Sequence, residues 1–129
     1  CAAGARTNTL KQMLSTLGVS SVDEMTKTAE EVMSIFTIAA NDKEVQLRLG
    51  NRLYGQKDYQ LRQEYLKLLQ TSFKADMQLE DFIGNAPRVA QTINAWVEQQ
   101  TNNLIKNLIA PTDLSADTRL VLVNCIYFK

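Results

Sequence analysis

The side chains that could carry out chemistry are few in this chain of 129 residues. It contains no histidine, so no imidazole can act as a general base, and its two cysteines, Cys1 and Cys125, are too few to form a zinc or copper site. Cys125 lies within an apolar run, where a thiol behaves as a small hydrophobe rather than as a nucleophile. Neighbouring carboxylates, which are typical of solvated charge, occur at Glu30, Glu31, Asp76, Glu80 and Asp81. The sequence therefore predicts no catalytic residue, no metal site and no cofactor.

Two asparagines interrupt apolar patterns. Asn51 lies on the apolar face of an alternating segment, and Asn124 divides the apolar run 120–128. A buried amide without partners costs about 1–3 kcal/mol, so we expect both side chains to be buried and hydrogen-bonded. They are either two satisfied core amides, which the spacing alone favours, or a polar cluster within a sheet whose strands must sometimes separate.

The composition indicates a globular, core-forming protein. Lys and Arg together number 14, as do Asp and Glu, and 45% of the residues are apolar. Without clustered basic residues the chain has no electrostatic footprint for nucleic acid or an anionic membrane. No stretch approaches the roughly 20 apolar residues that are needed to span a bilayer. We therefore expect neither nucleic acid nor a membrane as a partner, and a length of one domain or part of one.

Apolar residues at helical spacing predict four helices. Thr7 or Asn8 can cap the first, and Gly18 is placed to end it. Ser21 to Glu24 has the spacing of a capping box for the second, and Pro87 after Asn85 marks the start of the fourth. The predicted helices cover residues 7–17, 21–41, 61–73 and 85–100.

A change of period from about 3.6 to 2 predicts strands between these helices. Residues 45–53 alternate as a half-buried strand does, with Gln46, Arg48 and Arg52 on its polar face, and 77–79 form a short one. The run from Arg119 to Phe128 is too apolar to be covered on one face only, which indicates a central strand. Trp96 is expected to anchor the fourth helix against this sheet. The order of elements indicates an α+β or α/β protein.

Three segments together resemble the serpin family. Residues 4–17 are similar to the family's GARGNT…QM…L entry to its third helix, and residues 50–55 to ANRLFG of the second strand of its large sheet. Residues 93–108 and 118–129 are similar to INSWVE..T...I..L and T.LVLVNAIYFK, of which the last is highly specific. The resemblance covers essentially the whole chain.

The resemblance implies an α+β fold in which helices C to F pack on a large central β-sheet, with strands 2, 1 and 3 of sheet A. Residues 1–129 would be part of a single serpin domain, truncated at both ends and lacking the reactive-centre loop. Asn51 and Asn124 match the family's shutter positions, where the sheet parts to admit that loop. Ile93, Asn94 and Trp96 lie on helix F, which crosses the sheet and must move as the loop passes beneath it. The resemblance also implies that the protein is not an enzyme but an inhibitor, which traps a target protease by inserting its cleaved reactive-centre loop into sheet A.

The partners implied by this resemblance are a serine protease, or less often a cysteine protease, and the remaining part of the serpin domain. A non-inhibitory serpin that acts as a carrier, chaperone or storage protein is the alternative. An autonomous binding domain is disfavoured, because the last strand would remain a long unpaired apolar edge. Heparin is not expected to act through the second helix, where Lys27 is the only basic residue. An extracellular location is favoured on family grounds, while the absence of an N-x-S/T sequon fits an intracellular protein.

Overall fold

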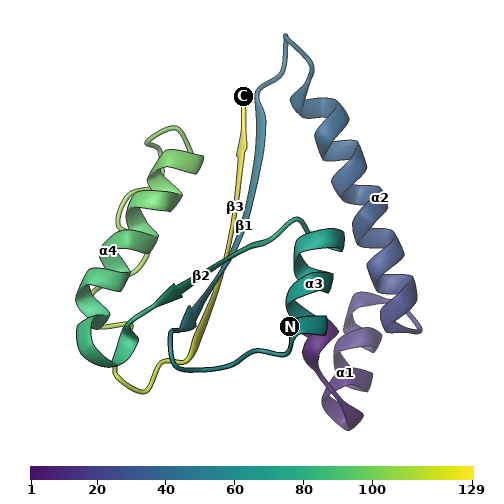
Figure 1. Ribbon diagram of the computed structural model, residues 1–129. Helices are drawn as coiled ribbons and strands as arrows, with labels where there is room; N and C mark the ends of the chain where they lie inside the picture. Colours follow the sequence, from purple (N-terminus) through teal and green to yellow (C-terminus); the bar gives the residue numbers. More distant parts are fainter.

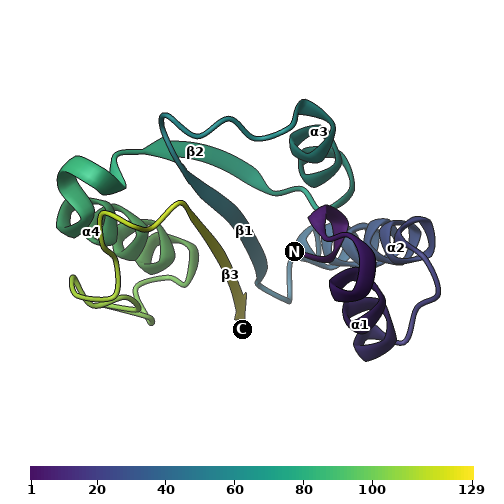
Figure 2. The same cartoon turned by 90° about the horizontal axis from the view of Figure 1, so that it is seen from below.

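A computed structural model describes residues 1–129 and places a small sheet between two groups of helices (Figure 1). A single helix, α4, lies on one side of the sheet, and α1, α2 and α3 lie on the other, as the view from below confirms (Figure 2). The elements in chain order are η1 (Ala2–Gly4), α1 (Thr7–Leu17), α2 (Val22–Ala40), β1 (Leu47–Gln56), α3 (Gln63–Ser72), β2 (Asp76–Glu80), α4 (Phe82–Gln100) and β3 (Leu120–Phe128). The fold is α+β, with helices packed against a mixed three-stranded sheet.

The sheet has the order β2-β1-β3, so β1 is its central strand. β1 runs parallel to β2, to which it is connected through α3, and antiparallel to β3. In the antiparallel pair, Asn51 lies opposite Asn124 and Gly50 lies opposite Cys125. This register fixes which side chains of the two strands share a face.

Within residues 1–129, β3 lies at the edge of the three-stranded sheet, whereas a central strand was predicted. Alternate residues of β3 are buried on the face toward α4, whereas Leu122, Ile126 and Phe128 are exposed on the other face. Phe128 is 71% exposed, which is unusual for a phenylalanine within a strand. A strand that is apolar on both faces needs cover on both, and residues 1–129 supply it on one.

The main core lies between α4 and the sheet. Tyr54 of β1, Val123 of β3 and Ile93 of α4 are all nearly inaccessible to solvent. The prediction that the alternate face of β1 is polar and solvated is therefore wrong. α4 covers this face, where Gly50 and Tyr54 are buried and Arg52 is partly buried.

α4 consists of a first turn and a longer helix with a break between them. The Asp81 carboxylate caps the first turn by accepting a hydrogen bond from the Gly84 N–H at 2.9 Å. Asn85 is not helical (φ −154°, ψ 52°), and the regular helix continues from the region of Pro87. The predicted start at Asn85 therefore marks this break, and the element itself begins one turn earlier.

The helix ends predicted on the other side of the sheet are largely confirmed. Gly18 ends α1 in the left-handed region, with φ 72°, where glycine has no steric penalty. The Ser21 hydroxyl caps α2 by accepting a hydrogen bond from the Glu24 N–H at 3.1 Å. The N-cap of α1 is Arg6 rather than Thr7 or Asn8, and its side chain makes no capping bond. No helix of the structure combines the length and apolar character required of a membrane span.

Gly50 permits the close approach of α4 to the sheet. A Cβ atom at this position would lie 2.8 Å from the Cys125 Sγ and 3.0 Å from the Trp96 Cη2. Both neighbours are buried, so neither can move away freely. We expect Gly50→Ala to lower the free energy of unfolding of the intact protein by about 1–3 kcal/mol, as a shift of the urea midpoint.

The double variant Gly50→Ala/Cys125→Ala provides the control, because it removes the nearer of the two clashing atoms. It should lose less stability than the sum of the two single variants. Strictly additive losses, or a Gly50→Ala midpoint equal to that of the wild type, would contradict this close packing.

Candidate functional site

The two asparagines singled out in the sequence contact each other directly. The Asn124 Nδ2 donates a hydrogen bond to the Asn51 Oδ1 at 2.6 Å. The Asn51 Nδ2 in turn donates to the backbone carbonyl of Phe73 at 3.3 Å. One chain of amide hydrogen bonds therefore connects β3, β1 and the end of α3.

The register of the sheet brings these amides together from positions 73 residues apart. Asn51 and Asn124 are direct partners across β1 and β3, and their side chains lie on the face opposite α4. Directly opposed residues of an antiparallel pair are close enough for short side chains to hydrogen-bond. The contact thus follows from strand pairing and needs no distortion of the backbone.

The third member of this chain is a helix terminus. Phe73 is the C-cap of α3, and carbonyls at a helix end have no partner within the helix. The Asn51 amide supplies the missing donor for the Phe73 carbonyl. The end of α3 is therefore fastened to the central strand by a side chain.

The predicted burial of both amides is wrong for one of them. Asn51 is half-buried, whereas Asn124 is exposed. The reason is its position on the edge strand, on the face that α4 does not cover. The Asn124 Oδ1 accepts no hydrogen bond from residues 1–129, so it can accept one from another group.

An open cavity of about 590 Å³ lies beside the amide pair. Its wall is formed by the two asparagines and Leu122 on the sheet side and by apolar residues of η1, α1, α2 and α3, including Met13 and Phe73, on the helix side. The few polar groups in this wall include the two amides. The others are Thr9, Gln12 and Thr16 of α1, so the cavity combines a mainly apolar wall with hydrogen-bonding groups on both its sheet side and its helix side.

The three α4 residues that the resemblance links to packing and movement of the helix have different surroundings. Ile93 is completely buried against the sheet, and Trp96 is 9% exposed, which confirms its role as a packing anchor. Asn94 instead faces the segment that follows α4. Its Nδ2 donates to the Ile109 carbonyl and its Oδ1 accepts from the Ile109 N–H, both at 2.8 Å. This side chain ties the connecting segment to the helix.

Sequence analysis missed a group of residues between α4 and the sheet. The Arg52 guanidinium lies over the Trp96 ring, 4.7 Å from its centroid, and the Tyr54 ring packs edge-on against Trp96 at 6.5 Å. Arg52 was assigned to the solvated face of its strand, because charged residues at alternate positions usually lie there. The available signal was the glycine and the tyrosine at 50 and 54, which share the face of Arg52.

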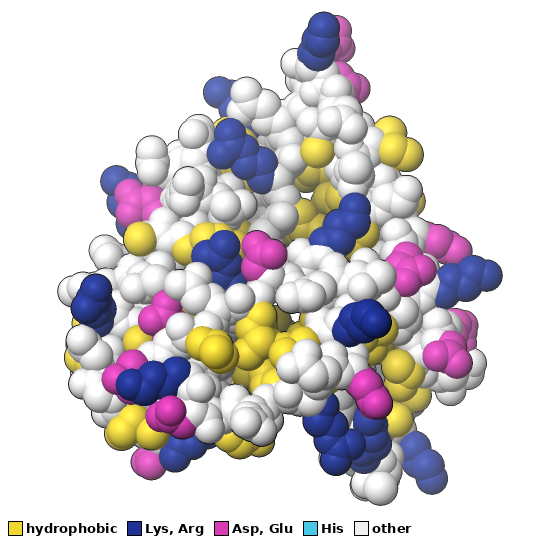
Figure 3. Space-filling view, viewed as in Figure 1, with side chains coloured by type: hydrophobic (Ala, Val, Ile, Leu, Met, Phe, Trp, Pro, Cys, Tyr) yellow, Lys and Arg dark blue, Asp and Glu magenta, His cyan; other side chains and the backbone are white.

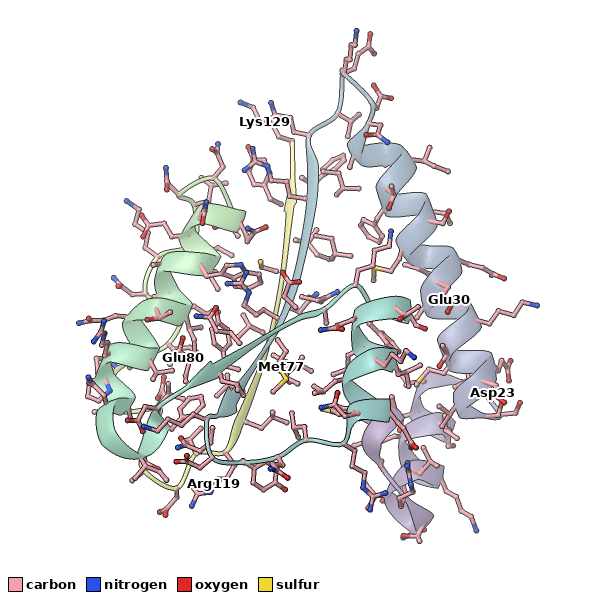
Figure 4. All side chains as sticks on the ribbon, viewed as in Figure 1. Asp23, Glu30, Met77, Glu80, Arg119 and Lys129 are labelled. Atoms are coloured by element: carbon pink, nitrogen blue, oxygen red, sulfur yellow. The ribbon has the colours of Figure 1, made fainter.

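The thiol and the carboxylates that were considered for chemistry take part in packing, helix capping and contacts between elements. Burial raises the pKa of the Cys125 thiol, more than the Gly50 N–H lowers it. The Gly84 N–H and then the Lys57 ammonium lower the pKa of Asp81, which serves as a helix cap. Figure 4 shows Glu30 beside α3, where it accepts a hydrogen bond from the Ser72 hydroxyl at 2.8 Å. These groups hold elements together and do not converge on a reaction centre.

Comparison with known proteins agrees with this architecture. The family model described as serpin (serine protease inhibitor) matches residues 1–129. Ipis-1 of Ixodes persulcatus is 40% identical over 127 residues, which cover 98% of this chain and 33% of that protein. Among solved structures, cleaved Serpin 42Da has 38% identity and a TM-score of 0.84, covering 99% of this chain and 33% of that chain. Ovalbumin from emu (Dromaius novaehollandiae) has 28% identity and a TM-score of 0.90, covering 99% of this chain and 36% of that chain.

These similarities extend over nearly all of the chain and only part of the relatives. The chain spans about a third of the length of the relatives that it matches. The family model that matches the chain is that of a serine protease inhibitor and not of an enzyme.

Proposed function

Because this chain belongs to the serpin family, we propose that it is part of an inhibitor that traps a serine protease, or less often a cysteine protease, by inserting its cleaved reactive-centre loop into the sheet. In this mechanism the protease attacks the loop as a substrate and forms an acyl-enzyme. The loop then joins the sheet as a new strand and carries the protease with it. The loop lies outside residues 1–129, which supply the parts that receive it.

The observation that carries this proposal is the apolar strand β3, which bears the Asn124 amide and has one unpaired edge within residues 1–129. Within residues 1–129, β3 pairs with β1 along one edge, so the N–H and C=O groups of its other edge would pair with a strand from the rest of the domain or with the inserted loop. Leu122 and Ile126 flank Asn124 on the exposed face and provide apolar contacts at alternate positions. An edge of this kind suits strand addition, in which the backbone supplies affinity.

The amide pair suits the role of a shutter. The Asn124 Nδ2 is held by Asn51, while its Oδ1 remains free for a donor from beyond the edge. A hydrogen bond to such a donor can be exchanged for another at low cost, because a net protein hydrogen bond contributes only about 1 kcal/mol. We propose that Asn51 and Asn124 hold the sheet closed through such exchangeable bonds until the loop enters.

α4 corresponds in this proposal to the helix that must yield as the loop passes. Ile93 and Trp96 hold it on the sheet by apolar packing, which has no fixed direction and re-forms readily. Asn94 binds the segment after α4 to the helix through two hydrogen bonds, so both can move together.

The remaining part of the serpin domain is the other partner that we propose. It would cover the exposed face of β3 and the cavity beside the asparagines, which apolar residues line. Residues 1–129 would then be part of one domain rather than an autonomous unit. A domain that left Ile126 and Phe128 exposed on an unpaired edge would be prone to aggregate.

The inhibitory function can be tested with the full-length protein. It is incubated with trypsin-like, chymotrypsin-like and elastase-like proteases, and the products are separated by denaturing gel electrophoresis. We expect a complex with at least one protease that survives denaturation, and none with the same protease after its active-site serine has been blocked. Cleavage by all three without any such complex would overturn the inhibitory function and leave a non-inhibitory serpin.

Asn124→Leu tests the shutter, because it replaces the amide with an apolar side chain of similar size. The variant leaves the half-buried Asn51 Oδ1 without its donor, at a cost of about 1 kcal/mol. We expect the native full-length protein to melt at a lower temperature and to convert faster to inserted or polymerised forms on native gels. Asn8→Leu, at an exposed position of α1, is the matched control and should behave as the wild type. Equal conversion of Asn124→Leu and Asn8→Leu would rule out a shutter at Asn124.

We propose that heparin does not accelerate inhibition through α2. Acidic side chains gather along the edge of the molecule where α2 lies (Figure 3), and Asp23 and Glu30 are labelled on it in Figure 4. The acidic residues of α2 are Asp23, Glu24, Glu30 and Glu31, against Lys27 as its only base. This is the wrong sign for a sulfated polysaccharide. We expect the inhibition rate to change less than about twofold with heparin at low salt, and an acceleration abolished by Lys27→Ala would contradict this.

A further inference from the structure

Arg52 connects three elements at the interface between α4 and the sheet. It projects from β1, its guanidinium lies 4.7 Å from the centroid of the Trp96 ring of α4, and its Nη2 lies 3.6 Å from the Asp76 Oδ2 of β2. The Arg52 Nη1 also donates to the Gln78 Oε1 of β2 at 3.4 Å.

We propose that Arg52 is a positioning residue that clasps the middle of α4 to the sheet and sets how readily the helix lifts. The inference rests on the proposed function, in which α4 moves as the reactive-centre loop passes. It assigns a role to Arg52, which lies in the segment 50–55 that resembles ANRLFG but to which the resemblance gave no function. It also identifies the break at Asn85 as the point about which α4 can turn.

The contacts of Arg52 favour stacking over ion pairing as the main attraction. Its side chain is 23% exposed, and its Nε is buried without a hydrogen-bond partner. The Asp76 side chain is 79% exposed, so water and salt weaken its attraction for the guanidinium. A planar guanidinium over the face of a largely buried tryptophan is favourable, and a lysine ammonium cannot reproduce this stacking. Asp76 therefore orients the Arg52 guanidinium, and the Trp96 ring provides its main attractive contact.

The two ends of α4 are attached differently. At its start, the Phe82 N–H donates to the Gln56 Oε1 at 2.8 Å, and Lys57 pairs with Asp81 at 3.1 Å. The break at Asn85 follows this attachment and precedes the regular part of the helix. α4 is thus fixed to the sheet at its first turn, can bend at Asn85, and is held again at Trp96 by Arg52. Loss of the Arg52 contact should loosen the part of α4 beyond Asn85, which Ile93 and Trp96 still pack against the sheet, and leave the first turn in place.

Hydrogen exchange of the full-length protein, followed by mass spectrometry, tests this prediction. Arg52→Ala should increase the exchange rate of peptides from residues 88–100 by about threefold to thirtyfold, the range expected for loss of one cation–π contact. Peptides from residues 82–84 and from β1 and β3 should change much less. Arg52→Lys, which keeps the charge without the planar group, should give an intermediate increase.

Arg48→Ala is the matched control, because Arg48 is the same residue type on the same strand and face. Its guanidinium lies 5.9 Å from the centroid of the Tyr127 ring of β3 and not over α4. It should leave exchange in 88–100 unchanged. Asp76→Asn changes only the orienting carboxylate and should give a smaller increase than Arg52→Ala, even if the latter folds poorly.

Three results would overturn the clasp. They are equal exchange of 88–100 in Arg52→Ala and the wild type, equal loosening of α4 and the strands, and the same effect from Arg48→Ala. These outcomes do not depend on the protease assay. If the wild type forms no protease complex, the proposed function fails while the exchange rates still decide whether Arg52 holds α4.

Discussion

The register of β1 against β3 is the constraint on which the other features depend. Because side chains alternate along a strand, this single alignment places Asn51 opposite Asn124 on one face and Gly50 opposite Cys125 on the other. A slip of one residue would separate the amides and push side chains into the space that Trp96 occupies beside Gly50. The polar pair and the close packing of α4 are thus two results of the same alignment.

The two faces of the sheet differ in physical character. The face toward α4 is closely packed, with Tyr54 and Ile93 fully buried. The opposite face carries the amide chain and an open apolar cavity between the sheet and the helices. Close packing resists small changes, whereas amides exchange partners at low cost. The division places the rigid contact and the exchangeable contact on opposite sides of the same strands.

Much of this arrangement could be predicted from local sequence signals. Alternation located the first two strands and an apolar run located the third, while Gly18 and Ser21 marked helix ends. The resemblance to the serpin family was confirmed over the whole chain. The position of β3 at the edge of the sheet formed by residues 1–129 could not be predicted, because apolar residues indicate the cover that a strand needs and not which segment provides it. The stacking of Arg52 was missed because an alternating charge is typical of a solvated face, and only the path of α4 shows otherwise.

The attachment of Asn51 to the end of α3 has a mechanical consequence. β1, α3 and β2 are consecutive in the chain, and the bond from Asn51 to the Phe73 carbonyl closes them into one braced unit. The bond from Asn124 adds β3 to this brace. A pull along β3 is therefore shared by two strands and a helix instead of shearing one ladder of backbone bonds. β1, α3, β2 and β3 would therefore move as one rigid unit, and deformation would concentrate at the edge of β3 that does not pair with β1.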